Sequence, residues 1–216
     1  MIGVIVPVHN EEQRLKHCIE SLLVAAFHHA LGNEPVRILI VLDACTDKSA
    51  HIAQTYGVMT LTCTHRNVGK ARAQGAEQLL AADARWLAFT DADSVVPDSW
   101  LVDQISFNVD AVCGLVEVND WSEHSIKVRE RYHAHYRTVD GHRHIHGANL
   151  GVSSTAYRKA GGFKGLPAHE DVQLVSDLER SGASIMWTAA NRVTTSARKD
   201  SRCREGFGDY LASLDP

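Results

Sequence analysis

The sequence lacks the long apolar runs that place a chain in a membrane or send it out of the cell. Nothing in it reaches the length of a membrane span. The N-terminal run Ile2–Val8 is short, has no basic region before it, and breaks into His9-Asn10-Glu11-Glu12. A signal peptide has a different pattern, so this run is predicted to be a buried strand.

The sequence also lacks an excess of positive charge and closely paired cysteines. The chain has 22 Lys and Arg against 26 Asp and Glu, and no basic stripe, which argues against a nucleic-acid partner. The five cysteines are scattered without close pairs, which predicts free thiols in a reducing compartment. We therefore expect a cytoplasmic protein, soluble or peripheral to a membrane, with no transmembrane segment.

Short β-rich runs alternate with helical patterns in the first half of the chain. The expected strands are Gly3–Val8, Arg37–Leu42, Val58–Cys63 and Trp86–Thr90. The expected helices are 15–26, with Asn10 as the N-cap, Lys48–Tyr56 and Lys70–Ala82. This alternation predicts an α/β fold whose polar loops gather at the carboxyl ends of the strands, where open sheets bind ligands.

The pattern is less regular after Asp93. Helices are expected at Pro97–Ile105, Ser122–Val139, Thr155–Ala160 and Glu170–Arg180. Strands are expected at Ala111–Val118, Gly147–Ser153 and Ser184–Thr188. The tail from Thr194 onward is polar and basic at first, and no element is assigned to it.

Two carboxylates, Asp91 and Asp93, follow the apolar strand that ends at Thr90. Residues two apart in an extended segment point to the same side, so both can face one hard divalent cation and the oxygens of a diphosphate. The alternative is a solvated turn, since so short a motif recurs by chance.

Two further loops carry polar groups at strand ends. Asp43 can accept a hydrogen bond from the N–H of a uracil or similar base, whereas Thr46 or Asp47 is expected to cap the next helix. The loop 65–70 places two cations and a glycine before a helix N-terminus, where anions are attracted. An exposed connection explains that loop equally well.

Glu170 and Asp171 stand together at an expected helix start. Carboxylates there are favoured by the helix dipole, so at least one of them is expected to have that structural role. The functional alternative makes one of them a general base that takes the proton of an acceptor hydroxyl.

Histidines crowd the segment 124–146. The pattern His142-x-His144-x-His146 can bind a transition metal, but no neighbouring cysteine completes a tetrahedral set. We assign these rings mainly to acceptor contacts or to a polar surface, with His146 and His169 nearest the expected site.

The order of these motifs resembles family 2 of the GT-A glycosyltransferases. The match consists of Val4–Glu12, Val41–Asp47, Arg66–Arg72, Asp91-Ala92-Asp93, Gly147–Val152, Ala160–Phe163 and Glu170-Asp171. It implies one GT-A domain over 1–216, with a mixed, mainly parallel sheet flanked by helices. Residues 1–95 would form the nucleotide-sugar-binding half and 96–190 the acceptor-side half. Residues 191–216 are a basic tail, with Arg198 and Arg202, that can close over the diphosphate; the alternative, which we favour, is a solvated C-terminal tail.

The resemblance implies a role for each matching residue. Asp93 looks like the principal ligand of Mg²⁺ or Mn²⁺, with Asp91 on the ribose or on a metal-bound water, and Asp171 looks like the base, with Glu170 beside it. The nucleotide-binding residues implied are Pro7, His9, Glu11, Asp43, Asn67, Lys70, Arg72 and Asp91. The implied reaction is inverting transfer of a sugar from a nucleotide-diphospho-sugar, preferably a UDP-sugar.

The acceptor implied is a small molecule, a glycan or a lipid-linked sugar, and a homodimer is compatible with the sequence. The base-reading loop departs from the family at Leu42 and Ala44-Cys45, and the tail motif of processive synthases is absent. The alternatives are a nucleotidyltransferase, which typically carries a glycine-rich N-terminal loop, and a catalytically silent nucleotide-sugar-binding module.

Overall fold

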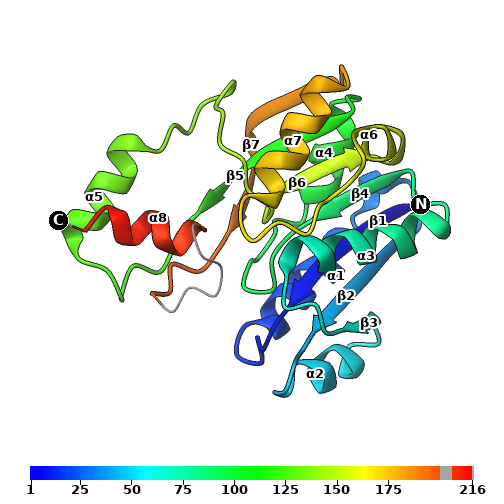
Figure 1. Ribbon diagram of the computed structural model, residues 1–216, viewed down its shortest axis with the longest axis horizontal. Coiled ribbons are helices and arrows are strands. Elements are labelled where there is room, and N and C mark those ends of the chain that lie inside the picture. Colours follow the sequence, from blue (N-terminus) through cyan, green and yellow to red (C-terminus); the bar gives the residue numbers. More distant parts are fainter. Residues whose placement is uncertain (200–205, 216) are drawn as a thin grey trace.

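The computed structural model describes residues 1–199 and 206–215, and in this part of the chain a seven-stranded sheet forms the centre (Figure 1). The strands are β1 (Ile2–Val8), β2 (Val36–Asp43), β3 (Met59–Cys63), β4 (Trp86–Phe89), β5 (Ala111–Glu117), β6 (Leu150–Ser153) and β7 (Ile185–Thr194). Their order is β3-β2-β1-β4-β6-β5-β7. Only β6 runs antiparallel to its neighbours, β4 and β5, so the predicted mixed, mainly parallel α/β sheet is confirmed.

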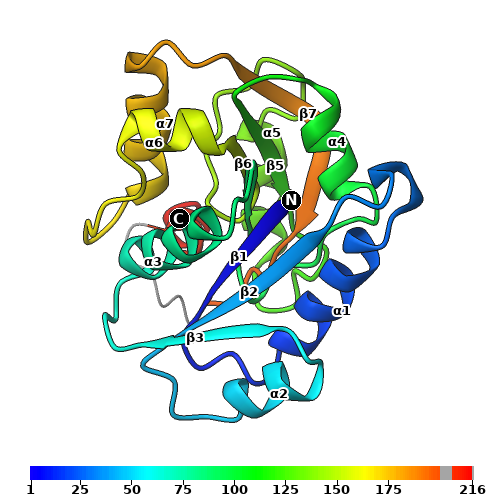
Figure 2. The ribbon, with the colours of Figure 1, turned by 90° about the vertical axis from the view of Figure 1, so that its right-hand side faces the viewer.

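Helices cover both faces of this sheet. They are α1 (Leu15–Ala26), α2 (Ser49–Thr55), α3 (Val68–Ala81), α4 (Trp100–Ser106), α5 (Ile126–His135), α6 (Ser154–Ala160), α7 (Glu170–Arg180) and α8 (Phe207–Ser213), with the short 3-10 helix η1 (His29–Leu31). Helices α1, α2 and α4 pack on one face, and α3, α6 and α7 on the other (Figure 2). Helices α5 and α8 lie together to one side of the sheet, over a small core of their own (Figure 1).

Burial on both faces explains why the central strands are almost continuously apolar. Ile5 and Leu39 on neighbouring strands are fully buried under α3, while Val4 and Ile40 are fully buried under the opposite layer. Helix α3 approaches the sheet closely at Gly75, where a Cβ would lie 2.8 Å from a methyl of Ile5. The sheet is therefore held rigidly beneath the loops that follow β1, β2 and β4.

The structure corrects several predicted boundaries. Asn10 does not cap the first helix: it turns the chain with φ 55°, and α1 begins at Leu15. Helix α5 is shorter than the predicted Ser122–Val139, because Ser125 caps it and Tyr136 leaves it in an extended conformation. Strand β7 continues to Thr194 beyond the predicted end, and α8 and η1 were not predicted.

None of the helices within residues 1–199 and 206–215 combines the length and apolar character needed to cross a bilayer. The described cysteines Cys18, Cys45, Cys63 and Cys113 are free thiols, as predicted. Cys203 and Arg202, the latter part of the expected basic tail, lie outside the described residues.

Candidate active site

The loops that follow β1 and β2 are tied together by side-chain hydrogen bonds. Nδ1 of His9 lies 2.6 Å from the carbonyl oxygen of Asp43, and Oδ1 of Asn10 accepts the N–H of Thr46 at 2.7 Å. The N–H of Glu11 donates to Ser49 Oγ at 2.9 Å. These contacts place the partly exposed Pro7, the last residue but one of β1, and the predicted residues His9 and Glu11 at the carboxyl edge of the sheet.

Asp43 fastens a third loop to the same edge. Its two carboxylate oxygens accept the N–H groups of Arg66 and Asn67, at 2.8 and 2.9 Å. The predicted role for this side chain was to read a nucleotide base, and the structure adds a positioning role for the loop after β3. Asp47 accepts the N–H of Ser49, the first residue of α2, but Lys48 occupies the N-cap position and its side chain does not cap this helix, so the expected cap at Thr46 or Asp47 is wrong.

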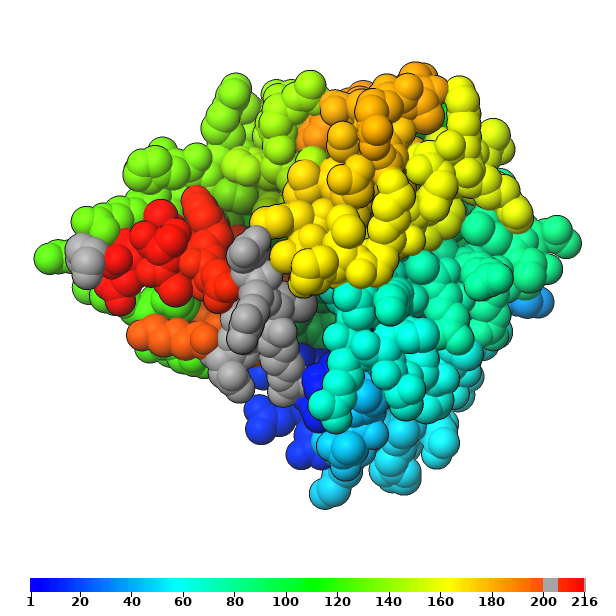
Figure 3. Space-filling view, viewed as in Figure 1, coloured from blue at the N-terminus to red at the C-terminus, as the bar shows by residue number. Residues whose placement is uncertain are grey.

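Asn67 connects the two halves of the chain. Its Oδ1 accepts the N–H of Lys70 at 2.8 Å and so caps α3, while its Nδ2 donates to the carbonyl of Leu166 at 2.7 Å. Lys70 itself is exposed and its methylene groups lie beside Gly165. The surface of residues near 60–70, in cyan, accordingly meets that of residues near 160–170, in yellow (Figure 3).

Arg72 is the most deeply buried charge of the site. Its guanidinium is ion-paired with Glu170 through Nη1 and with Asp91 through Nη2, the latter at 2.5 Å. One face lies against Gly147, where a Cβ would come within 2.5 Å of it, and Cζ lies 5.5 Å from the centre of the Phe163 ring. Burial lowers the pKa of Arg72, but the neighbouring carboxylates outweigh that influence and raise it overall.

The two aspartates after β4 have different surroundings. Asp91 is partly exposed and paired with Arg72, whereas Asp93 lies near Arg198, with 3.5 Å between Oδ2 and Nη2. Burial, together with the charges of Asp91 and Glu11, raises the pKa of Asp93 to about 6 against the opposing charge of Arg198. Asp93 therefore carries a charge that a further cation would stabilise.

Glu170 and Asp171, in the first turn of α7, also differ. Glu170 is buried against Arg72, and burial raises the pKa of Glu170 while Arg72 opposes the shift. Oδ2 of Asp171 accepts the N–H of Gly147 at 2.7 Å, and the side chain remains partly exposed. The expectation that one of the pair serves the helix dipole is thus incomplete, since Glu170 also completes a buried ion pair.

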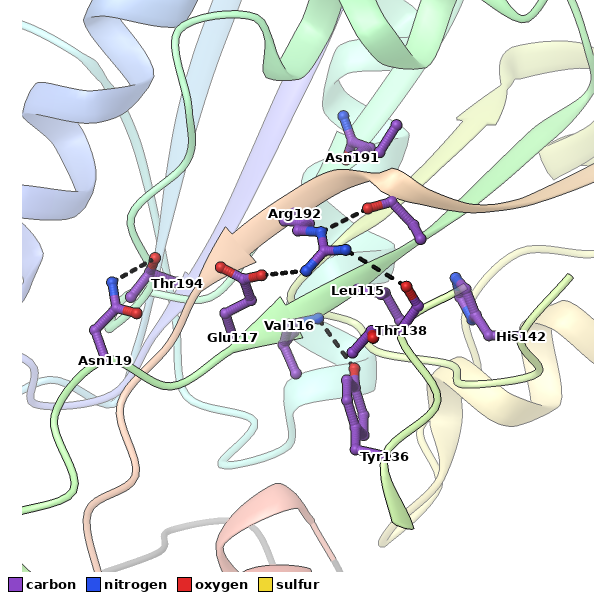
Figure 4. A network of polar contacts seen from close by, with 12 residues as sticks. Leu115, Val116, Glu117, Asn119, Tyr136, Thr138, His142, Asn191, Arg192 and Thr194 are labelled. Carbon is purple, nitrogen blue, oxygen red and sulfur yellow. Dashed lines mark hydrogen bonds and ion pairs between the residues drawn. The ribbon is translucent and has the colours of Figure 1, made fainter. Parts of the chain in front are cut away.

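A chain of hydrogen bonds leads from β5 towards the base candidate. The N–H of Val116 donates to Oη of Tyr136 at 3.1 Å (Figure 4), and that hydroxyl lies 2.8 Å from Nε2 of His146. Burial lowers the pKa of His146 to about 4, despite the opposing charge of Asp171. His146, which directly precedes Gly147, is therefore a neutral imidazole near pH 7.

The other histidines of this segment are engaged by the protein itself. Nε2 of His142 bonds to the carbonyl of Thr188, and Nε2 of His144 accepts the N–H of Arg137. Across residues 1–199 and 206–215, no three His, Cys, Asp or Glu side chains gather as a metal-binding group. The alternative of a histidine-bound transition metal therefore has no support in this part of the chain. His169 lies just before α7.

Arg198 belongs to the basic tail that the sequence predicts, and the structure gives its side chain specific partners. It follows β7 and forms a two-pronged ion pair with Glu11, at 2.8 and 2.6 Å. Its presence at the sheet edge depends on the length of β7, whose end pairs with Val95 just beyond Asp93. The sequence placed Arg198 in a tail that can close over a diphosphate, but it did not predict the ion pair with Glu11 or the position beside Asp93.

Comparison with known proteins supports a relationship over most of the chain. A family model described as glycosyl transferase family 2 matches residues 3–163. No curated protein sequence gives a significant match.

Solved structures share the fold at low sequence identity. S. aureus TarS 1–349 in complex with UDP-GlcNAc has a TM-score of 0.71 and 14% identity, covering 99% of this chain and 64% of that one. The Pyrobaculum calidifontis mannosyltransferase PcManGT, in complex with GDP-Man and Mn²⁺, has a TM-score of 0.66 and 15% identity, covering 93% and 58%. The chain therefore spans less than two thirds of the length of either structure.

Proposed function

Because the chain belongs to glycosyl transferase family 2, we propose that it transfers a sugar from a nucleoside diphosphate donor to a hydroxyl group of an acceptor. One observation carries the proposal. Asp91 from the nucleotide-binding half and Glu170 from the acceptor-side half converge on the buried guanidinium of Arg72. Each of these carboxylates has a neighbour in the sequence that does not pair with Arg72. In this proposal Asp93 serves the donor and Asp171 serves the acceptor.

The donor we propose is a UDP-sugar. Asp43 lies at the carboxyl end of β2, and a carboxylate has more accepting positions than the two backbone hydrogen bonds that its oxygens accept. A carboxylate so placed can accept the imide N–H of uracil. The helix α3, capped by Asn67, begins directly after the loop that Asp43 fastens, which supports a site for an anionic ligand.

Asp93 fits a divalent cation, Mg²⁺ or Mn²⁺, that is completed by the phosphates of the donor. Hard cations of this kind are commonly held by one or two protein carboxylates together with substrate phosphates, so a group of three protein ligands is not required. The raised pKa of Asp93, at about 6, marks the negative charge that such a cation would balance. When bound, the cation would stabilise the departing diphosphate as a Lewis acid.

Asp171 is the general base in this proposal. As the acceptor oxygen bonds to the anomeric carbon, its proton passes to Asp171, and the bond to the nucleoside diphosphate breaks with its electron pair on the leaving phosphate. The N–H of Gly147 holds Asp171 in place at 2.7 Å, and neutral His146 lies next in sequence. In-line displacement of this kind inverts the anomeric centre.

The proposal also covers the acceptor, the location of the protein and its oligomeric state. The acceptor is a small molecule, a glycan or a lipid-linked sugar, and the chain works as one domain in the cytoplasm, alone or as a homodimer. The hydrogen bond from Asn67 to Leu166 supports a single unit, because it joins the two halves directly.

Calorimetry with UDP and GDP tests the donor assignment. We expect UDP to bind in the presence of Mn²⁺, to bind much more weakly in excess EDTA, and to bind more tightly than GDP. Asp93→Ala should abolish the Mn²⁺-dependent binding, and Asp98→Ala, which changes an exposed aspartate nearby, should not. Equal binding in EDTA contradicts the cation, and tighter binding of GDP contradicts uracil recognition.

Release of UDP from a panel of UDP-sugars tests the reaction itself, because water can serve as a poor acceptor. Mn²⁺-dependent release by the wild type but not by Asp93→Ala supports transfer. Binding of the UDP-sugars without release, in the presence of a broad acceptor panel, favours the silent binding module.

A further inference from the structure

Arg198 lies beside Asp93, the protein ligand of the cation in the proposed function. Its Nη2 is 2.6 Å from Oε1 of Glu11 and 3.5 Å from Oδ2 of Asp93, so the two carboxylates converge on one nitrogen. The exposed fractions of the three side chains are only 15%, 7% and 15%. A cation that binds between these carboxylates would occupy the same place as the guanidinium nitrogen.

The backbone on both sides of Arg198 is anchored. Thr194 exchanges two backbone hydrogen bonds with Val95, at 2.8 and 3.0 Å, and its hydroxyl accepts from Asn119 (Figure 4). Nε2 of His124 lies 2.5 Å from the carbonyl of Ala197, and the N–H of Lys199 donates to a carboxylate oxygen of Glu123 at 3.1 Å. We therefore expect any movement of Arg198 to be a movement of its side chain, while the backbone stays in place.

We propose that the Arg198 guanidinium is an internal competitor of the divalent cation for Glu11 and Asp93. This inference rests on the proposed function. Two like charges cannot occupy the same pair of carboxylates without strong repulsion, so cation binding requires the guanidinium to leave. The long side chain can then turn to another anion while its backbone stays anchored.

The anion that arrives with the cation is the diphosphate of the donor. A planar guanidinium matches phosphate oxygens in the same two-pronged manner as it matches the carboxylate of Glu11. Arg198 thus weakens the binding of the cation by itself and strengthens the binding of the cation together with a nucleotide. The consequence is a site that discriminates against free metal and binds metal and donor together.

Titration of Mn²⁺ alone, followed by electron paramagnetic resonance of the free ion, tests the competition. We expect Arg198→Ala to bind Mn²⁺ about tenfold more tightly than the wild type, and to bind UDP in saturating Mn²⁺ about tenfold more weakly. Arg198→Lys keeps the charge but cannot form the two-pronged pair, and should lie between them. Arg192→Ala is the matched control, because Arg192 lies on β7 shortly before Arg198 and is ion-paired with Glu117 on β5 (Figure 4).

The outcomes separate this inference from the proposed function. Unchanged or weaker Mn²⁺ binding by a folded Arg198→Ala, while the wild type binds UDP with Mn²⁺, overturns the competition alone. Absence of Mn²⁺ binding by both proteins, even with UDP, overturns the cation assignment and the competition together. Circular dichroism and thermal melting establish that each variant is folded, and Arg198→Lys supplies a second measurement if the alanine variant is not.

Discussion

Replacement of Glu170 by glutamine removes one charge from the buried ion pair with Arg72 and leaves the size of the side chain unchanged. If Glu170 served only the helix dipole of α7, the cost would be a few tenths of a kcal/mol. The structure predicts more, because Arg72 is buried and would keep only Asp91 as its charged partner.

The size of this loss of stability is set by one cost and by three effects that reduce it. Removal of one partner from a buried ion pair typically costs about 3–5 kcal/mol, because the other charge is left uncompensated. Asp91 still pairs with Arg72, and glutamine still offers a carbonyl oxygen, which both reduce the loss. The raised pKa of Glu170 shows that burial of its charge is itself unfavourable, and glutamine avoids that penalty. We therefore expect a loss of about 2 kcal/mol of unfolding free energy.

Urea denaturation and thermal melting measure this loss, which corresponds to a decrease of roughly 4–8 °C in Tm for a chain of this size. Glu179→Gln is the control, since Glu179 is half exposed on the same helix and pairs with Arg143, and should cost under about 1 kcal/mol. Equal stability of the two variants would refute the argument from the buried pair.

Turnover should show the opposite order. Asp171→Asn can still accept the N–H of Gly147 but cannot take a proton, so turnover at saturating donor should fall by roughly 10²–10⁴-fold with donor affinity nearly unchanged. Folded Glu170→Gln should remain within about tenfold of the wild type. An inactive Glu170→Gln beside an active Asp171→Asn would exchange the two roles.

Three further predictions concern pH and packing. Asp93 has a folded-state pKa of about 6, above its ordinary 3.8, so in EDTA the wild type should lose stability as pH rises through this range. Asp93→Asn should then be more stable than the wild type at pH 7.5, by up to about 3 kcal/mol. Urea denaturation measures this difference in unfolding free energy, and a difference that persists below pH 4 would contradict the prediction. His146 has a folded-state pKa of about 4, below its ordinary 6.5, so its stability contribution should be lost as pH falls from 6.5 to 4. His146→Gln should lack that loss, and identical acid denaturation of the two proteins would exclude the lowered pKa of His146. Gly147→Ala places a Cβ within 2.5 Å of the Arg72 guanidinium and should lower both Tm and turnover, whereas an unchanged melting curve would mean that Arg72 can move aside.

Periodicity in the sequence predicted the first half of the fold well, because its strands are buried on both faces. The runs expected at Gly3–Val8 and Arg37–Leu42 correspond to β1 and β2, and the polar residues after them do meet at one edge. The loops there are held by side chains such as Asp43 and Asn67, which belong to the short motifs themselves and can be recognised in the sequence. Boundaries in the second half were less accurate because β7 has polar residues in its second part, among them the buried Asn191.

The partners of Arg72 could not be read from a motif, although its helical position contains a signal. Arg72 shares a face of α3 with the buried Ala76 and Leu79, and Glu170 shares a face of α7 with the buried Leu174. A charge on an apolar helix face must find an opposite charge inside the protein. This reasoning would have predicted two buried charges of opposite sign, but only the packing of α7 beside α3 pairs them.

That pairing explains how adjacent carboxylates acquire different chemistry. Neighbouring carboxylates such as those of Asp91 and Asp93 repel each other. Both can stay ionised only if one of them is paired with a positive charge. Arg72 neutralises Asp91 and, with its other nitrogen, Glu170. In the proposed function Asp93 is left to a cation and Asp171 to a proton, so one buried arginine would set the roles on both sides of the site. If that function is correct, we expect any change that moves its guanidinium to affect donor binding and acceptor activation together.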